Sequence, residues 1–309
     1  MTASIFVQIP SYRDHELPRT VADAIARASG SMRVGFGIHS CVLPGDDITI
    51  GSTPEWVTVG FVESVAPVNI GLQAGRRLAN NLYNGEDYYL QIDSHMRFVD
   101  GWDLKLVAMI EAYRRDGIPK PLISMYPPTY TLNANGDTIL HANPNFYPTR
   151  ISFAEIPEQF SRTLIPSQTA TATEEGCVFT ASVSGGFVFA DGGFAEVAPN
   201  PLIAFWGEEI LIAARAFTAG FDLVTATTDI VYHLYHSGQP YELTRRHHVW
   251  VDFPAEFAEL DMRSKAELQR ILSAKIVGDG ALGSARDLDD YGRFAGLDFK
   301  TRTVTQVWR

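Results

Sequence analysis

Short apolar runs alternate along the chain with longer segments in which apolar residues recur every three to four positions. The runs have the length and composition of buried β-strands, and the spaced segments have the periodicity of helices that pack by one face. The predicted strands cover residues 5–9, 34–38, 57–62, 88–92, 122–125, 178–190 and 229–235, and the predicted helices lie near residues 17–28, 72–82, 106–113, 205–217 and 264–276. This alternation predicts an α/β protein with a mostly parallel central sheet.

Two features depart from the regular alternation. Residues 127–175 are rich in Pro, Asn and Thr and have little periodicity, which is typical of a functional or irregular insertion rather than a plain linker. Gly185 and Gly186 interrupt a predicted strand, and such a pair often marks the close approach of another group to the backbone. With no internal repeat, we predict one main domain over residues 1–240 and a C-terminal extension over residues 241–309 that packs on it.

The composition is that of an ordinary globular protein, with 46% hydrophobic and 20% charged residues among 309. A net charge of −11 gives no electrostatic reason to expect stable binding to nucleic acid or to a membrane. Cys41 and Cys177 lie in apolar surroundings, which favours small buried residues over a disulfide or a metal pair. Because the chain starts without a targeting segment and has no apolar run of membrane-spanning length, we expect a cytoplasmic protein.

Candidate metal ligands follow the strand predicted at residues 88–92. Asp93 and His95 are two positions apart, so an extended backbone would point both to one side, at the sheet edge where open α/β folds bind ligands. His233, near the end of a late predicted strand, is the best third ligand, and His236 is the reserve. A mixed oxygen and nitrogen set suits Mn²⁺ better than Mg²⁺ and leaves positions for a diphosphate. The alternative is a carboxylate that caps the following turn beside a hydrogen-bonded histidine.

A pair of acids opens a predicted helix. Glu208 and Glu209 directly follow Trp206 and Gly207. A carboxylate at this position could orient an acceptor hydroxyl or take its proton. The alternative is that acids at a helix N-terminus only provide a favourable charge–dipole placement, which does not explain why a Trp-Gly turn should present them.

A third cluster follows the first predicted strand, where Pro10 precedes Ser11-Tyr12-Arg13-Asp14. Tyr12 could stack on a base while Arg13 or Asp14 bonds to the base or the ribose; the alternative is a simple helix-start signal from Ser11 or Asp14.

Two arginine-containing positions carry less information. Arg76 lies on a predicted helix, where an exposed arginine is usually only solvated. The stretch Arg245-Arg246-His247-His248 could contact phosphates, although a short basic cluster is more often plain surface.

These stretches together resemble a family of N-acetylglucosaminyltransferases typified by eukaryotic cytoplasmic enzymes that glycosylate hydroxyproline. The Asp-Ser-His and Trp-Gly-Glu motifs are also similar to those of the polypeptide N-acetylgalactosaminyltransferases. The resemblance extends over nearly the whole chain and is carried by residues 11–14, 85–98, 101–103, 184–189, 205–209, 231–235, 283–286 and 294–299.

The resemblance implies a GT-A fold for the main domain and a UDP-sugar donor, expected to be UDP-GlcNAc, with transfer that retains the anomeric configuration. It implies that Asp93, His95 and His233 bind Mn²⁺ (or Mg²⁺) and that Glu209, with Glu208 beside it, is the acidic catalytic position. The residues expected to bind the donor are Pro10, Ser11, Tyr12, Arg13, Asp14, Arg76, Ser94 and Trp206. The acceptor would carry a hydroxyl on a protein side chain, a modified nucleobase or a small metabolite.

Two other functions use the same residues. A sugar-nucleotide-binding module of the same fold could have lost catalysis, although the presence of both acids and three candidate ligands argues against this. A metal-dependent hydrolase could use the three ligands to activate a water molecule that attacks the sugar nucleotide.

Overall fold

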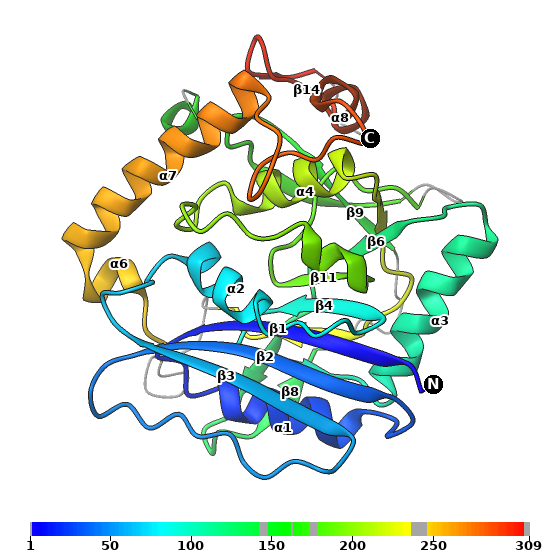
Figure 1. Ribbon diagram of the computed structural model, residues 1–309, viewed down its shortest axis with the longest axis vertical. Helices are drawn as coiled ribbons and strands as arrows, with labels where there is room; N and C mark the ends of the chain where they lie inside the picture. Colours follow the sequence, from blue (N-terminus) through cyan, green and yellow to red (C-terminus); the bar gives the residue numbers. More distant parts are fainter. Residues whose placement is uncertain (1, 142–147, 162, 174–177, 236–245, 306–309) are drawn as a thin grey trace.

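A seven-stranded sheet forms the centre of the molecule (Figure 1). The computed structural model describes residues 2–141, 148–161, 163–173, 178–235 and 246–305. The sheet order is β12–β6–β11–β4–β1–β2–β3, with β1 at Ser4–Tyr12, β2 at Arg33–Val42, β3 at Val57–Val65, β4 at Tyr88–Ile92, β6 at Pro121–Ser124, β11 at Phe187–Asp191 and β12 at Asp222–Thr225. Neighbouring strands are parallel except at β11, which runs antiparallel to both β4 and β6. The predicted α/β class with a mostly parallel sheet is confirmed.

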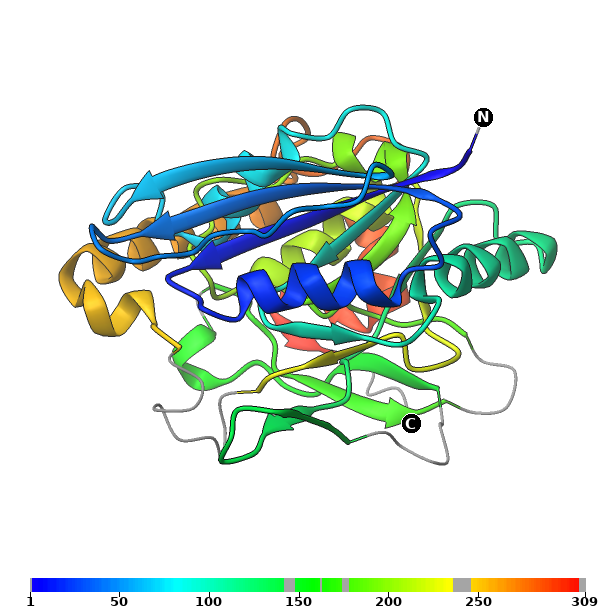
Figure 2. The same cartoon turned by 90° about the horizontal axis from the view of Figure 1, so that it is seen from below.

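The two faces of the sheet bury separate apolar clusters, as the alternation of side chains along β1 requires. Ile5, Val7 and Ile9 belong to one cluster, together with side chains of α1 (Leu17–Arg27) and α3 (Trp102–Arg115). Phe6 belongs to the other, which includes most of α4 (Glu208–Thr218), while α2 (Leu72–Asn80) packs against β1 and β2. Figure 2 shows α1 running along one face of the sheet.

A small antiparallel pair next to the sheet positions the site. After β4 the chain turns through residues 93–95 into β5 (Met96–Phe98), which pairs with β13 (Val231–His233) so that His233 lies opposite Met96. Thr20 of α1 holds this turn, because its hydroxyl donates to the Ser94 carbonyl at 2.7 Å and accepts from the Met96 N–H at 2.9 Å. A turn, rather than a continuous strand, therefore presents the residues around Ser94.

The span predicted as an insertion contains short hairpins. Strands β7 and β8 pair antiparallel, as do β9 and β10. These elements are β7 (Tyr130–Leu132), β8 (Thr138–Leu140), β9 (Thr149–Phe153), the 3-10 helix η1 (Glu158–Phe160) and β10 (Gln168–Ala172). Each is only three to five residues long, which is too short to produce a clear periodic pattern in the sequence.

The C-terminal helices pack on the main core. Leu268 and Tyr291 are buried in the same cluster as Phe6. The elements of this region are α6 (Val249–Asp252), α7 (Pro254–Ala274), α8 (Leu288–Ala295), β14 (Leu297–Asp298) and β15 (Thr303–Val304), and η2 (Gly192–Glu196) follows β11. Helix α7 starts at Pro254 rather than at the predicted Ser264. The prediction missed its first ten residues because they bury only Phe257 and so show little apolar periodicity. The sequence pattern also predicts no helix at α8.

The predicted domain boundary at residue 240 and the reserve ligand His236 lie outside the described residues, as does Cys177. Among the residues that are described, no helix combines the length and the apolar character needed to cross a membrane.

Candidate active site

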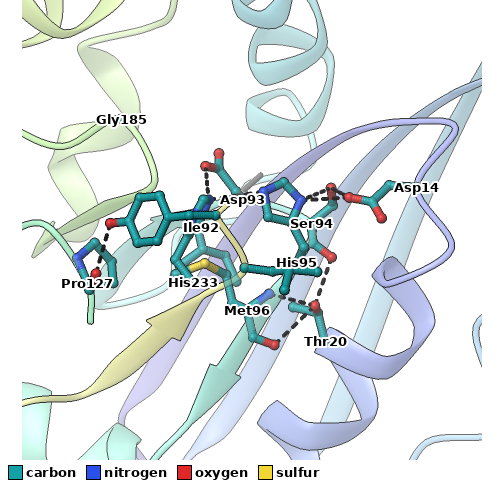
Figure 3. Close-up of polar contacts among 12 residues, drawn as sticks. Asp14, Thr20, Ile92, Asp93, Ser94, His95, Met96, Pro127, Gly185 and His233 are labelled. Atoms are coloured by element: carbon teal, nitrogen blue, oxygen red, sulfur yellow. Dashed lines mark hydrogen bonds and ion pairs between the residues drawn. The ribbon is translucent and has the colours of Figure 1, made fainter. Parts of the chain in front are cut away.

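The three predicted metal ligands converge (Figure 3). One side-chain atom from each of Asp93, His95 and His233 can be chosen so that all three lie within 4.8 Å of one another. The Nε2 atoms of His95 and His233 are 3.0 Å apart, and Oδ2 of Asp93 is 3.3 Å from Nε2 of His233. The predicted convergence of these side chains is confirmed.

Asp14 orients one of the candidate ligands. Its Oδ2 lies 2.6 Å from Nδ1 of His95 and accepts a hydrogen bond from the Ser94 hydroxyl, also at 2.6 Å. Burial would raise the pKa of Asp14, but the hydrogen bonds that it accepts from His95 and Ser94 hold this pKa well below its usual range. Burial, together with the positive charge of Arg246, lowers the pKa of His95 to about 4. His95 is therefore neutral at pH 7, and a carboxylate on Nδ1 leaves the Nε2 lone pair free to face the cluster.

The side chains present fit a divalent cation. Two neighbouring nitrogen ligands of an octahedral metal ion, each at about 2.1 Å, stand about 3 Å apart, which is the separation of the two Nε2 atoms. Nδ1 of His233 is buried and has no hydrogen-bond partner among the described residues, so nothing in the described chain prevents this nitrogen from carrying the proton. Nε2 of His233 is then available as a ligand. Two imidazoles and one carboxylate form a set that suits Mn²⁺.

Arg76 forms a buried bridge beneath the cluster. Its guanidinium donates to Oδ1 of Asp93 at 2.9 Å, to the Gly185 carbonyl at 2.7 Å and, more weakly, to Oε2 of Glu208 at 3.5 Å. The side chain has no solvent exposure and does not line the cavity. Arg76 thus occupies Oδ1 of Asp93 and leaves Oδ2 facing His233, which makes it a positioning residue.

The two acids at the start of α4 face different partners. Glu208 accepts a hydrogen bond from Gln73 at 2.6 Å, whereas Glu209 accepts from Gln168 at 2.7 Å and from the Gly185 N–H at 3.0 Å. Burial raises the pKa of Glu208. Burial also raises the pKa of Glu209 to about 8, against the opposing hydrogen bond from Gly185, and the charge of Glu208 adds to the rise. Neither glutamine could be recognised from the sequence, because each acts through a contact across the fold.

The glycine pair in front of β11 lets these groups approach closely, as predicted. A Cβ atom on Gly185 would lie 2.1 Å from Oε1 of Glu208, and a Cβ atom on Gly186 would lie 2.7 Å from Oδ2 of Asp93. Any larger residue would have to displace a carboxylate.

A cavity of about 940 Å³ contains the cluster. Its walls include Pro10, Ser11, Tyr12, Asp14, Ser94, Trp206, Glu208 and Glu209, all of which the sequence identifies, together with His39, Gln168 and Trp250, which it does not. His39 follows a predicted strand directly, at the same sheet edge as Pro10, and this position is a signal that could have identified it.

Arg13 lies outside the cavity lining. Its guanidinium forms ion pairs with Asp46 at 2.8 Å and Asp252 at 2.7 Å, and Tyr12 donates to the same Asp252 at 2.9 Å. This contact fastens α6, whose residues Val249 to Val251 line the cavity, to the end of β1.

Two solved structures are similar to this chain. GalNAc-T7 crystallised with UDP, GalNAc and Mn²⁺ matches at a TM-score of 0.51 with 14% identity, over 94% of this chain and 54% of that one. S. aureus TarS 1–349 matches at a TM-score of 0.45 with 11% identity, over 98% of this chain and 71% of that one. The chain thus spans about half of the GalNAc-T7 chain. The similarity confirms the predicted GT-A fold.

A search of curated protein sequences finds no match. A family model described as Glycosyltransferase (GlcNAc) matches residues 69–301, which hold the three converging ligands and both acids of α4. This chain belongs to the GlcNAc glycosyltransferase family, whose members are nucleotide-sugar-dependent transferases.

Proposed function

We propose that the protein is a Mn²⁺-dependent, retaining glycosyltransferase that moves GlcNAc from UDP-GlcNAc to a hydroxyl acceptor. The observation that carries this proposal is the convergence of Asp93, His95 and His233 inside a cavity that two acids of α4 also line. Membership of the GlcNAc family supports the donor, and the presence of UDP and Mn²⁺ in the similar GalNAc-T7 structure supports the nucleotide and the metal.

Asp93 Oδ2 and the Nε2 atoms of His95 and His233 would hold the cation. When bound, a divalent cation neutralises the charge that develops on a departing nucleoside diphosphate. The residues around the ligands prepare the site for it, because Asp14 fixes the His95 ring and Arg76 fixes the Asp93 carboxylate.

The nucleoside end of the donor would bind where β1 and β2 end. Pro10, Ser11 and Tyr12 of β1 and His39 of β2 line the cavity there, at the carboxyl edge of the parallel strands. Ser94, between two of the ligands, lines the same cavity. Arg13 is engaged by Asp46 and Asp252, so we assign it to holding α6 rather than to the donor.

Glu209 would act on the acceptor. In its ionised form it accepts a hydrogen bond from the acceptor hydroxyl and stabilises positive charge at the anomeric carbon. The acceptor oxygen bonds to that carbon on the face from which the diphosphate departs, and the hydroxyl proton passes to the departing diphosphate oxygen. This sequence retains the anomeric configuration without a protein nucleophile. Glu208, held by Gln73 and Arg76, would position this end of α4.

The test is UDP release from UDP-GlcNAc with and without Mn²⁺. We expect release that EDTA stops and that Mn²⁺ restores, and we expect Asp93→Asn and His95→Ala each to remove it while the far-UV circular dichroism stays native. His141→Ala, at an exposed histidine outside the cavity, is the matched control. Release that is independent of metal would contradict the proposal, and release that no acceptor accelerates would identify a hydrolase instead.

A further inference from the structure

A half-exposed tryptophan stands directly beside the proposed catalytic acid. Trp206 is 44% exposed although it lines the cavity, and only Gly207 and Glu208 separate it from Glu209. Gly207 adopts a φ of +86°, and a Cβ atom there would lie 2.5 Å from Leu268. A turn that favours glycine therefore places a large aromatic ring beside the two acids that line the cavity.

Trp206 is part of an apolar wall. Its ring centroid lies 5.8 Å from that of Phe160, and Pro157 and Ile165 line the same cavity. The segment that carries these residues also carries Gln168, which donates to Glu209 at 2.7 Å. We call the side chains of Pro157, Phe160, Ile165 and Trp206 the apolar wall. Trp206 is connected to Glu209 through the chain, and the segment with the other three residues is connected to Glu209 through the hydrogen bond from Gln168.

Core packing accounts for Ile165, which belongs to the main apolar cluster, and for Phe160, which packs against that cluster, but not for Trp206, which stays 44% exposed at the cavity. A large aromatic ring that is left partly in water at a cavity suits a binding role. The two acids next to Trp206 disfavour one class of ligand. Glu208 and Glu209 both line the cavity at the start of α4, so an anionic group close to Glu209 would be repelled. A neutral molecule with a flat apolar face fits both features.

We propose that Trp206 and Phe160 form the acceptor subsite, and that the acceptor is a neutral hydroxyl compound whose hydroxyl stands beside a flat apolar ring face. This inference rests on the proposed function, because it assigns the hydroxyl to Glu209. Only Gly207 and Glu208 separate Trp206 from Glu209 in the chain, so the ring face and the hydroxyl of the acceptor must lie close to each other. Both an aryl alcohol and a pyranose ring have this geometry, whereas a linear polyol has no such face.

The test compares four acceptor probes in the UDP-release assay with Mn²⁺ and UDP-GlcNAc. Benzyl alcohol and methyl β-glucopyranoside are the ring probes, and 1,4-butanediol and xylitol are the linear ones. We expect at least one ring probe to be used about tenfold more efficiently than either linear probe, and the identity of the better ring probe distinguishes an aryl from a sugar acceptor. Equal efficiencies for all four probes would overturn the inference while leaving the donor assignment intact.

Substitutions of Trp206 test whether this residue causes the preference for ring acceptors. Trp206→Ala should raise the acceptor KM about tenfold relative to the donor KM, and Trp206→Phe should restore most of the loss because it keeps a ring face. Met262→Ala, at a 65% exposed residue of α7 outside the cavity, is the control and should match the wild type. Retention of the ring preference in Trp206→Ala would refute the role of this residue.

A binding measurement separates failure of the inference from failure of the proposed function. Saturation-transfer NMR detects binding of the four probes to the protein without donor or metal. Ring probes that bind to the wild type and not to Trp206→Ala would support the subsite even if no UDP were released. Binding of ring probes that is unchanged in Trp206→Ala would overturn it.

Discussion

Removal of the Arg76 guanidinium gives a sharp prediction, because its neighbour Arg77 is a matched control on the same helix. Arg76 has no exposure and bridges Asp93 and Glu208, whose side chains are 24% and 10% exposed. Arg77 pairs with Asp279, which is 71% exposed. Methionine at either position keeps the aliphatic stem and removes only the charge and the donors.

The two substitutions should differ in cost. Removing one partner of a buried ion pair costs about 3–5 kcal/mol, because the remaining charge is left without compensation. Among the described residues, Arg76→Met would leave Gln73 as the side-chain hydrogen-bond partner of Glu208, and it would remove the guanidinium that donates to the Gly185 carbonyl. An exposed pair contributes only about 0–1 kcal/mol. We therefore expect Arg76→Met to lower the free energy of unfolding by about 2 kcal/mol or more beyond the effect of Arg77→Met.

Equilibrium urea unfolding of the metal-free protein measures this difference, provided that the m-value is the same for both variants. Mn²⁺ titration calorimetry gives a second readout, since loss of the group that orients a metal-binding carboxylate weakens metal affinity about 10–100-fold. Equal stability of the two variants would refute the reasoning about burial. Unchanged Mn²⁺ affinity in a folded Arg76→Met protein would refute the positioning role.

Three further predictions concern the same site. Gly186→Ala should weaken Mn²⁺ binding at least about tenfold, because its Cβ would lie 2.7 Å from the Asp93 carboxylate, whereas Gly193→Ala, with nothing within 4 Å, should bind Mn²⁺ normally in the same titration. Asp14→Asn should weaken Mn²⁺ binding about 10–100-fold, because the amide does not fix the His95 ring as the carboxylate does, and wild-type affinity in this variant would exclude the orienting role. The raised pKa of Glu209, from a usual 4.5 to about 8, means that the folded metal-free protein holds a proton there that the unfolded chain has lost between these pH values. The stability of the wild type relative to Glu209→Gln should therefore fall as the pH rises from 5 to 8, by at most about 1.4 kcal/mol per pH unit, and parallel urea-unfolding profiles of the two proteins would contradict the shift.

Local patterns predicted most of the sheet, although not its edge strand β12, and indicated two of the three candidate ligands. The run at β4 is rich in aromatic and aliphatic side chains and follows a turn signal, so its start follows from the sequence. Asp93 and His95 are residue types that bind metals, and they directly follow a predicted strand. Their position at the end of this strand limits the directions in which their side chains can point. His233 could be chosen as the third ligand only from the family resemblance and from its position near a strand end. The strand that pairs with the strand of His233, β5, has three residues and is too short to be predicted, so the pairing that brings His233 to the site could not be foreseen.

The parts that could not be predicted depend on contacts across the fold. From the sequence, Arg76 could be interpreted only as a solvated arginine of a predicted helix or, through the family resemblance, as a donor-binding residue, whereas it is fully buried between two carboxylates. Gln73 and Gln168 have no local signal, because glutamine is common on surfaces and only the fold brings each to an acid. The first half of α7 could not be predicted for a different reason. It is helical but mostly exposed, so its apolar periodicity is weak.

The charges around Arg76 connect the metal site to the acid. Without a cation, one buried guanidinium faces the ionised Asp93 and the Glu208 carboxyl, and a further negative charge on Glu209 is unfavourable, which is part of the reason why the Glu209 pKa is raised. A divalent cation held by Asp93 adds two positive charges to the same cavity and must therefore lower that pKa. A bound cation therefore favours the ionised form of Glu209, which is the stronger acceptor for a hydrogen bond from an acceptor hydroxyl. The same carboxyl charges that favour a proton on Glu209 in the metal-free protein are thus balanced in part when a cation is bound.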